Sequence, residues 1–236
     1  MGKNIWIHRI NMILPFENPK ISILLTSYNN PTGLERAIQS VLNQTYQNFE
    51  IILLDDNSDD PKVLEILEKY KKHPKIKFYN SNIKEEDRLK ESPYARQINI
   101  GLKMATGKLI VYMCDDAEYL PEKFEKMVRF FKKHPFAKVC YNQQKQIEEN
   151  TGRIIRILKP DRILRDPFCK VDHNSVMHYK SCIDKVGNWE TFALKLADAY
   201  FWRKLGKKYP FYPIKEILEN HYQGEKSFSR KEIKKE

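Results

Sequence analysis

The sequence predicts an α/β fold in a single domain, with a mixed, mainly parallel sheet flanked by helices. Two observations support this prediction. Short apolar runs rich in Ile, Val and Leu alternate along the first half with segments whose apolar residues recur at helical spacing, and this alternation is typical of parallel strands joined by helices. The chain has 236 residues with 41% hydrophobic content, which is enough for one sizeable core.

The first half supplies the alternating elements. In the first predicted helix, Leu34, Ala37, Ile38 and Val41 recur at the spacing of one helix face. Gly107 follows the third helix as a typical stop signal. The predicted elements, in order, are a strand at 20–27, a helix at 33–43, a strand at 49–54, a helix at 62–70, a strand at 76–79, a helix at 94–105, a strand at 108–113 and a helix at 121–133 that covers the sheet.

The pattern changes after residue 137. Segments 138–141 and 153–158 are predicted to form a hairpin through the turn residues at 150–152. A strand at 171–179 and a helix at 194–205 follow. Because no linker or repeat separates these elements from the first half, we expect them to complete the same sheet.

Composition narrows the class of protein. No apolar run approaches the roughly 18 residues that a membrane span requires, and the amino-terminal stretch lacks the features of a signal peptide. The four cysteines are scattered without a Cys-x-x-Cys pair, so we expect reduced thiols in the cytoplasm rather than a zinc or redox site. The net charge of +11 suggests an anionic partner, which could be nucleic acid, a membrane surface or a nucleotide phosphate.

Two adjacent carboxylates stand where the fourth predicted strand ends. Asp115 and Asp116 follow the apolar run 109–113, and ligands of open α/β sheets collect at the carboxyl ends of strands. Because like charges side by side repel, the pair suggests a divalent metal with a phosphate-bearing ligand. The alternative is an acidic turn in which one Asp caps the next helix.

Polar clusters also follow the first two strands. Thr26 begins a group of small polar residues, and Asp55 and Asp56 end the second strand. One of these two acids could accept a hydrogen bond from a base or a ribose, while another acid caps the following helix. Gly-x-Gly-x-x-Gly and Gly-x-x-x-x-Gly-Lys loops are absent from the sequence, which argues against dinucleotide-dependent oxidoreductases and P-loop enzymes.

Taken together, these strand ends resemble glycosyltransferase family 2, whose enzymes have the GT-A fold, a Rossmann-like α/β architecture. The matching segments are 22–29 (SILLTSYN), 37–45 (AIQSVLNQT), 49–58 (FEIILLDDNS) and the acidic pair at 115–116. In the second half, the chain is similar to the spore-coat polysaccharide glycosyltransferases of this family. Those matches are 172–178 (DHNSVMH), 197–202 (ADAYFW) and 209–213 (YPFYP).

The resemblance implies a nucleotide site. It places Asp56 on the uracil base, with Thr26 and Tyr28 lining the same pocket. It also implies that Arg88 contacts the nucleotide, for which the alternative is a solvated loop cation. Asp115 is then expected to face the ribose.

The resemblance implies a metal and a catalytic base as well. Asp116 is expected to bind manganese or magnesium, since hard cations prefer oxygen ligands. Asp198 occupies the position of the catalytic base, although Ala197 replaces the usual Glu before it; the alternative for Asp198 is a helix N-cap. His173 is expected near the donor phosphates or the acceptor, and His178 receives no role.

The resemblance further implies an organisation into parts. It covers residues 21–222 and predicts an amino-terminal arm at 1–19, a GT-A domain at 20–222 and a basic tail at 223–236. Within the domain, residues 20–116 form the expected nucleotide-binding half and residues 117–222 the acceptor-binding half.

The expected activity is that of a metal-dependent, inverting glycosyltransferase. It would move a sugar from a UDP- or dTDP-sugar to a hydroxyl of a glycan or lipid-linked acceptor, in polysaccharide or cell-surface glycan biosynthesis. We expect a cytoplasmic enzyme, with at most peripheral association with the inner face of the membrane and no nucleic-acid partner. The alternatives are a sugar-phosphate nucleotidyltransferase and a non-catalytic nucleotide-sugar-binding module.

Overall fold

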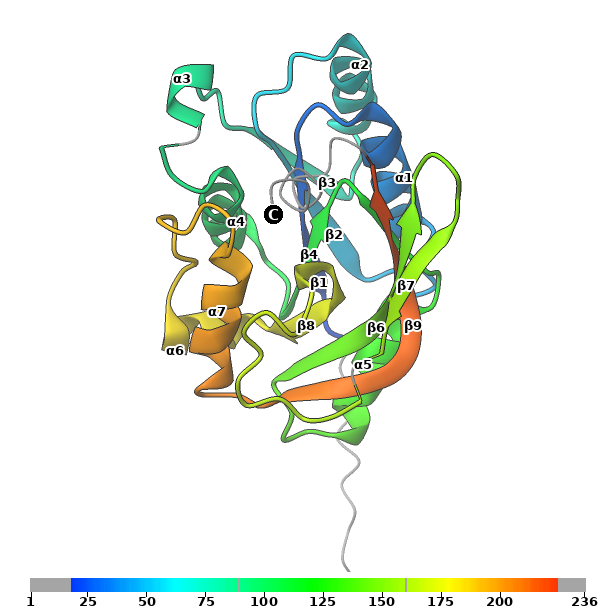
Figure 1. Cartoon of the computed structure of the whole chain (residues 1–236), viewed down its shortest axis with the longest axis vertical. Helices are drawn as coiled ribbons and strands as arrows, with labels where there is room; N and C mark the ends of the chain where they lie inside the picture. Colours follow the sequence, from blue (N-terminus) through cyan, green and yellow to red (C-terminus); the bar gives the residue numbers. More distant parts are fainter. Residues whose placement is uncertain (1–17, 89, 160, 225–236) are drawn as a thin grey trace, which may run out of the picture.

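A computed structural model describes residues 18–224 except 89 and 160. Its centre is a nine-stranded mixed sheet in the order β3-β2-β1-β4-β8-β6-β9-β5, with β7 paired to β6 outside this path. Figure 1 shows the sheet curving from β3 to the long β6–β9 pair. The predicted α/β fold, with helices flanking one mixed sheet, is confirmed.

The first half forms the parallel part of the sheet. Strand β1 (Ile21–Ser27) lies between β2 (Phe49–Asp55) and β4 (Leu109–Cys114), and β3 (Ile76–Asn80) forms the edge. All three pairings are parallel. Every residue of β1 and β2 is buried, as expected of strands that are covered on both faces. The parallel register brings the carboxyl ends of β1, β2 and β4 to one edge.

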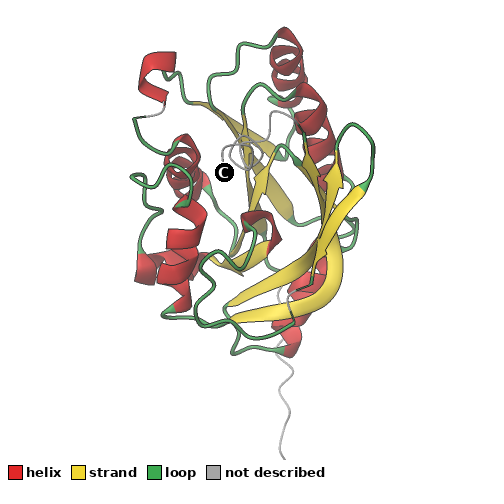
Figure 2. Ribbon diagram, viewed as in Figure 1, coloured by secondary structure: helices red, strands yellow, loops and turns green. Residues whose placement is uncertain are grey.

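Helices cover both faces of this sheet (Figure 2). On one face, α1 (Pro31–Leu42), α2 (Pro61–Tyr70) and α5 (Lys123–Lys133) share one apolar core with the strands. On the other face, α4 (Pro93–Met104) and α7 (Ala197–Gly206) share a second core.

Local signals in the sequence start three of these helices. Proline lies in the first turn of α1, α2 and α4, where its missing N–H is not needed. The side chains of Asn30, Asp60 and Ser92 cap the three helices. Gly33 is required by packing, because a Cβ there would lie 2.1 Å from the carbonyl oxygen of Asp115. The start of α1 therefore packs directly against the end of β4.

The second half completes the sheet, as the sequence predicted. Strand β8 (Val176–Tyr179) pairs antiparallel with β4 and with β6 (Val139–Glu148). A hairpin of β6 and β7 (Ile154–Leu158) is present, but its pairing differs from the prediction: residues 144–147 pair with β7, whereas residues 139–141 pair with β8 and β9. Strand β9 (Phe211–Gln223) runs parallel to β6 and antiparallel to the short β5 (Ala117–Tyr119). These last pairings bring the end of β9 beside the turn that carries Asp115 and Asp116.

Some boundaries differ from the predictions. The strand expected at 171–179 begins only at β8, because Asp172 caps a 3-10 helix, η1 (His173–Ser175), that precedes it. The helix expected at 194–205 begins three residues later, at the start of α7. Strands β5 and β9 were not predicted, nor were the short elements α3 (Glu85–Arg88), η2 (Lys180–Cys182) and α6 (Ile183–Val186).

A buried ion pair lies beneath η1. The side chains of Lys123 and Glu219 are fully buried and paired with each other. The Lys123 ammonium also donates a hydrogen bond to the carbonyl oxygen of Asn174, at 2.7 Å, and the Gln144 amide donates to Glu219, at 2.9 Å. Leaving one member of such a buried pair alone costs several kcal/mol, about 3–5 in measured cases. The pair therefore ties η1 to α5 and β9.

The predicted arm (1–19) and basic tail (223–236) lie almost entirely outside the described residues. Within the described part of the chain, no helix has the length and apolar character needed to cross a bilayer.

Candidate functional site

The candidate site lies at the carboxyl ends of β1, β2 and β4. In Figure 1, α4 and α7 flank this edge on the left and the β6–β9 pair flanks it on the right. Because β4 contacts η1 directly, the polar residues predicted from both halves of the chain approach one another there.

Asp56, Tyr28 and Arg88 come together at the ends of β1 and β2. The Arg88 Nε donates to Asp56 Oδ2 at 2.6 Å, and the Arg88 guanidinium lies 3.2 Å from the centre of the Tyr28 ring. Arg96, which no sequence motif marked, donates to the other oxygen of Asp56 at 3.3 Å. Arg88 is therefore not a solvated loop cation, because its guanidinium contacts two of the three residues predicted for the base pocket, Asp56 and Tyr28.

The neighbouring acid, Asp55, has a structural role. Its fully buried carboxylate accepts hydrogen bonds from the backbone N–H and hydroxyl of Ser58, at 2.9 and 2.6 Å, and from the amide of Asn80, at 2.9 Å. Burial raises the pKa of Asp55. Its oxygens bind the turn after β2, which leaves Asp56 as the acid of this pair that faces the arginines.

Asp115 binds the loop between β1 and α1. Its carboxylate accepts hydrogen bonds from the Ser27 hydroxyl at 3.0 Å, the Tyr28 N–H at 3.1 Å and the Asn30 amide at 3.3 Å. Burial, and next the charge of Asp116, raise the pKa of Asp115 to about 7. The ribose contact of Asp115 stays a prediction.

The side chain of Thr26 is oriented toward β4. Its hydroxyl lies 3.5 Å from both the carbonyl oxygen of Met113 and the sulfur of Cys114. Only 7% of the residue is exposed. Its predicted place in the base pocket stays a prediction.

Asp116 belongs to a chain of ionisable groups that was not expected from the sequence. Its Oδ2 lies 3.2 Å from Nε2 of His221, whose Nδ1 lies 3.3 Å from Oδ2 of Asp172. Although burial opposes it, the two carboxylates raise the pKa of His221 well above its usual range. Burial would raise the pKa of Asp116, but the charge and hydrogen bond of His221, together with the charge of His173, outweigh burial and lower that pKa. Asp116 caps no helix, because α5 begins after Glu122.

Asp116 and His221 are the groups that fit a metal ion. The Oδ1 atom of Asp116 is buried without a hydrogen-bond partner among the described residues, which leaves a hard oxygen donor free. Once His221 loses its proton, its Nε2 adds a nitrogen donor beside this carboxylate. Within the described part of the chain, no group of three or more His, Cys, Asp or Glu side chains could hold a metal ion. Any metal here would therefore need ligands from a bound substrate or water.

Asp198 lies in the first turn of α7 and does not act as the N-cap. The N-cap residue is Leu196, and the Asp198 carboxylate accepts the N–H of Ala199 at 2.8 Å. The aromatic side chains of Phe201 and Trp202 are fully buried in the same helix. Burial raises the pKa of Asp198, as its position predicted.

His173 lies between Asp198 and the end of β4. Its Nδ1 is 4.0 Å from Asp198 Oδ2 and its Nε2 is 3.0 Å from the sulfur of Cys114. The ring also packs against Tyr94, with 5.0 Å between ring centres. Next to it, the Asn174 side chain accepts the Cys114 N–H at 2.8 Å and donates to Asp172 at 2.9 Å. The His173 segment is thus anchored to the strand that carries Asp115 and Asp116.

His178 belongs to the core. It is fully buried, and its two ring nitrogens lie 2.7 Å from the Tyr112 hydroxyl and 2.8 Å from the carbonyl oxygen of Tyr179. Burial lowers its pKa to about 4. This histidine is neutral and structural.

Comparison with known proteins identifies the family of this chain. Residues 22–190 match the model of glycosyl transferase family 2. The chain therefore belongs to that family, and the expected enzyme class is confirmed. The nucleotidyltransferase alternative is set aside.

The chain is also similar to individual proteins and to a solved structure. The chain is 36% identical over 219 residues to Protein CgeD of Bacillus subtilis, covering 89% of this chain and 51% of CgeD. It is 34% identical over 103 residues to the GalNAc(5)-diNAcBac-PP-undecaprenol beta-1,3-glucosyltransferase of Campylobacter jejuni, covering 43% of this chain and 31% of that enzyme. The structure of S. aureus TarS in complex with UDP-GlcNAc is similar in fold, with a TM-score of 0.71 and 17% identity over 86% of this chain and 58% of TarS. The chain thus spans about half the length of CgeD.

Proposed function

We propose that this chain transfers a sugar, with inversion, from a UDP- or dTDP-sugar to a hydroxyl of a glycan or lipid-linked acceptor. The observation that supports this most directly is the position of Asp198. Its carboxylate has a pKa raised by burial, and it lies 4.0 Å from His173, which in turn contacts Cys114 beside the acidic pair. His173 therefore links Asp198, the proposed proton acceptor, to the end of β4, where the acidic pair begins.

Asp198 acts as the general base in this proposal. Its carboxylate takes the proton from the acceptor hydroxyl, and the hydroxyl oxygen attacks the anomeric carbon of the donor sugar. The bond from that carbon to the leaving nucleoside diphosphate breaks in the same displacement. A raised pKa suits this task, because a base is most effective when its pKa approaches the working pH.

Asp56, Tyr28 and Arg88 hold the nucleotide in this proposal. The Asp56 carboxylate would accept the N3–H of uracil or thymine, and the Tyr28 ring, which Arg88 covers, offers an aromatic face near the base. Arg88 would then move aside or contact the nucleotide itself. Thr26 and Asp115 complete this side of the site, with Asp115 near the ribose.

Asp116, with His221, would hold a manganese or magnesium ion. When bound, such an ion supplies positive charge that stabilises the diphosphate leaving group. The buried Oδ1 of Asp116, which has no partner among the described residues, supports this assignment. His173 would contact the donor phosphates or the acceptor.

The relatives support the donor and acceptor classes. TarS was crystallised in complex with UDP-GlcNAc, which favours a nucleotide-sugar donor for this fold. The Campylobacter relative is named for an undecaprenol-linked acceptor, which makes a lipid-linked acceptor, and work at the inner face of a membrane, the natural hypothesis here. We propose no nucleic-acid partner, because the phosphates of a nucleotide-sugar donor already supply the anionic partner that the positive net charge suggests.

A panel of nucleotide sugars tests the proposal. Each donor is incubated with the protein and manganese, with and without acceptor extract, and the released diphosphate is measured. We expect release from one UDP- or dTDP-sugar that rises with acceptor and falls when the metal is chelated. Absence of release from every donor would refute transfer, and nucleotide binding without any turnover would favour a non-catalytic binding module.

A further inference from the structure

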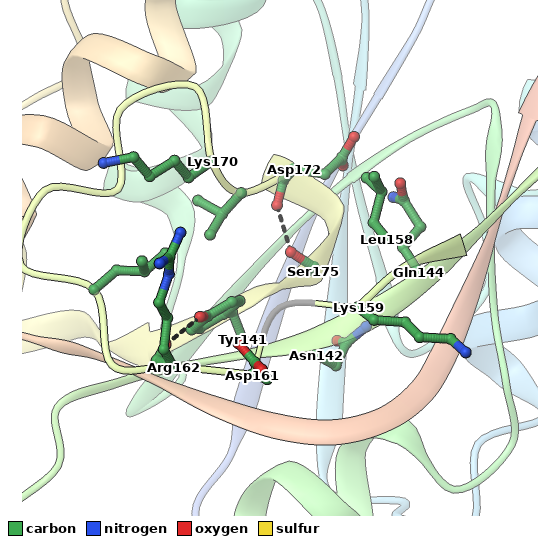
Figure 3. Close-up of a pocket in the computed structure, with 12 residues that line it drawn as sticks. Tyr141, Asn142, Gln144, Leu158, Lys159, Asp161, Arg162, Lys170, Asp172 and Ser175 are labelled. Carbon is green, nitrogen blue, oxygen red and sulfur yellow. Dashed lines mark hydrogen bonds between the residues drawn. The ribbon is translucent and has the colours of Figure 1, made fainter. Parts of the chain in front are cut away.

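A pocket of about 300 Å³ opens beside the candidate catalytic residues. Figure 3 shows it between β6 and the segment that follows β7, with Asp172 on the side that faces η1. Asp172 directly precedes His173, which lies 4.0 Å from Asp198. The pocket therefore shares with the candidate site the segment that carries Asp172 and His173, in the half of the chain where the acceptor is expected to bind.

The pocket holds an unsatisfied hydrogen-bond acceptor. Asn142 lines it and is only 1% exposed. Its side-chain NH₂ donates to the carbonyl oxygen of Gln143 at 2.7 Å, but its Oδ1 has no partner among the described residues. Because a buried polar atom without a partner costs free energy, this oxygen is suited to a hydroxyl or N–H donor from a ligand.

The pocket also presents positive charge. Arg162 lines it, and Figure 3 shows the side chain extending toward the segment of Lys170 and Asp172. Its guanidinium has no hydrogen-bond or ion-pair partner within the described residues. Lys159, Lys170 and the acid Asp161 also line the pocket, and Figure 3 shows the Lys159 side chain extending away from Arg162. The Asp172 carboxylate is engaged by His221 at 3.3 Å and by the Asn174 N–H at 2.9 Å, so it is not free to neutralise Arg162.

We propose that this pocket binds a sugar unit of the acceptor that carries a negative charge, either as a phosphate or as a carboxylate. Arg162 pairs with the anionic group, and Asn142 Oδ1 accepts a hydrogen bond from a hydroxyl of the same unit. Arginine suits this task, because its planar guanidinium can donate two parallel hydrogen bonds to a phosphate or carboxylate. This inference rests on the proposed function and extends it, since it makes the acceptor anionic.

Binding of simple probes tests the inference without any transfer step. Glucose 6-phosphate, glucuronate, glucose and inorganic phosphate are titrated against the full chain, and binding is followed by ligand-observed NMR. We expect both charged sugars to bind more tightly than glucose, and at least one to bind more tightly than inorganic phosphate. The tighter of the two identifies a phosphate or a carboxylate as the preferred group.

Two variants assign the binding to this pocket. Arg162→Ala should weaken binding of the preferred charged sugar by about tenfold, which is the loss expected for one charge-assisted hydrogen-bonding group. Asn142→Asp should also weaken it, through charge repulsion. The matched control is Arg165→Ala, which removes an exposed arginine three residues away and outside the pocket. Thermal melts show whether each variant is folded, and Arg162→Ala is expected to remain so because its side chain is exposed.

Several results would overturn the inference. These are equal binding of glucose and the charged sugars, equal losses in Arg162→Ala and Arg165→Ala, or inorganic phosphate binding as tightly as either charged sugar. A matching loss of UDP affinity in Arg162→Ala would assign the pocket to the donor instead. Because these titrations need neither donor nor metal, they separate this inference from the proposed function. If the charged sugars bind but no sugar is transferred from any donor, the proposed function is refuted and this inference is not.

Discussion

The carboxylate of Asp198 and the imidazole of His173 lie 4.0 Å apart, although they come from different elements, α7 and η1. Both are only partly exposed, with 28% and 17% of their side chains accessible. The charge of His173 opposes the effect of burial, which nevertheless raises the pKa of Asp198. The base is therefore protonated at higher pH than an ordinary aspartate, while still in contact with solvent.

Replacing Asp198 by Asn should abolish most of the transfer activity. We expect kcat to fall roughly 10²–10⁴-fold, the usual contribution of a general base, with nucleotide affinity unchanged. The change is measured by diphosphate release at saturating donor. Asp184→Asn, an exposed acid in α6, is the matched control, and parental activity in Asp198→Asn would remove it from the base role.

The raised pKa of Asp198 predicts the acid limb of the rate profile. Asp198 must be ionised to accept a proton, so kcat should fall as pH decreases through its folded-state pKa. Because burial raises this pKa, the fall should begin at a higher pH than the ordinary aspartate value of about 3.9. Transfer rates measured from pH 4 to pH 8 at saturating substrates check this. A rate independent of pH over that range would contradict the assignment.

Asp116→Ala should remove the metal dependence of nucleotide binding. In the parent chain, calorimetry is expected to show tighter UDP binding with manganese than with a chelator. The variant should bind UDP equally weakly under both conditions, because the carboxylate that would hold the ion is gone. Glu65→Ala, on the exposed face of α2, serves as the control, and a full manganese effect in Asp116→Ala would rule out this ligand.

The proposed role of Asp56 predicts which nucleobase the site prefers. A carboxylate accepts the N3–H of uracil or thymine, whereas N3 of cytosine is itself an acceptor and would be repelled. We expect UDP and dTDP to bind more tightly than CDP, and Asp56→Asn to reduce this preference by roughly tenfold or more, since hydrogen bonds to charged groups contribute about 1.5–3 kcal/mol. Competition titrations with the three diphosphates measure it. An unchanged preference in the variant would place base recognition elsewhere.

His178 predicts a loss of stability in acid. Its pKa is about 4 in the folded chain, against an ordinary histidine value of 6.5 that applies to the unfolded chain. Between pH 6.5 and pH 4, His178 is therefore protonated in the unfolded chain but neutral in the folded chain. The free energy of unfolding falls over this range. At about 1.4 kcal/mol per pH unit, the loss approaches about 3 kcal/mol. Urea unfolding at pH 7 and pH 4 should show this loss in the parent but not in His178→Gln. A parallel loss in both proteins would contradict it, and His73→Gln is the control.

Much of the first half of the fold could be predicted because β1 and β2 are fully buried and appear in the sequence as continuous apolar runs. Helices α1, α2 and α4 each carry an apolar face and a proline in the first turn. Strand β9 was missed for the opposite reason. Its residues alternate between buried and exposed positions irregularly, and its inward positions include Glu219 and His221, so neither hydrophobicity nor period marks it as a strand.

Some contacts of the site follow from motifs in the sequence, although the roles of the residues stay predictions. Asp56 and Tyr28, from motifs at the ends of β2 and β1, lie together with Arg88, and Asp198 lies 4.0 Å from His173. His221 could not be found, because its contact with Asp116 depends on the antiparallel pairing of Ala117 with His221. Asp172 stood inside a recognised motif, but its position against His221 follows from the 3-10 turn that replaced the expected strand.

The buried Lys123–Glu219 pair has a practical consequence for mutagenesis. Lys123 also binds the carbonyl oxygen of Asn174, the residue that joins Cys114 to Asp172. Substitutions at any of these positions would be recovered in a screen for lost activity, although none of the side chains is proposed to touch substrate. Measurements of folded yield are therefore needed to separate such variants from those at Asp198, whose loss should leave the amount of folded protein nearly unchanged because burial disfavours its charge.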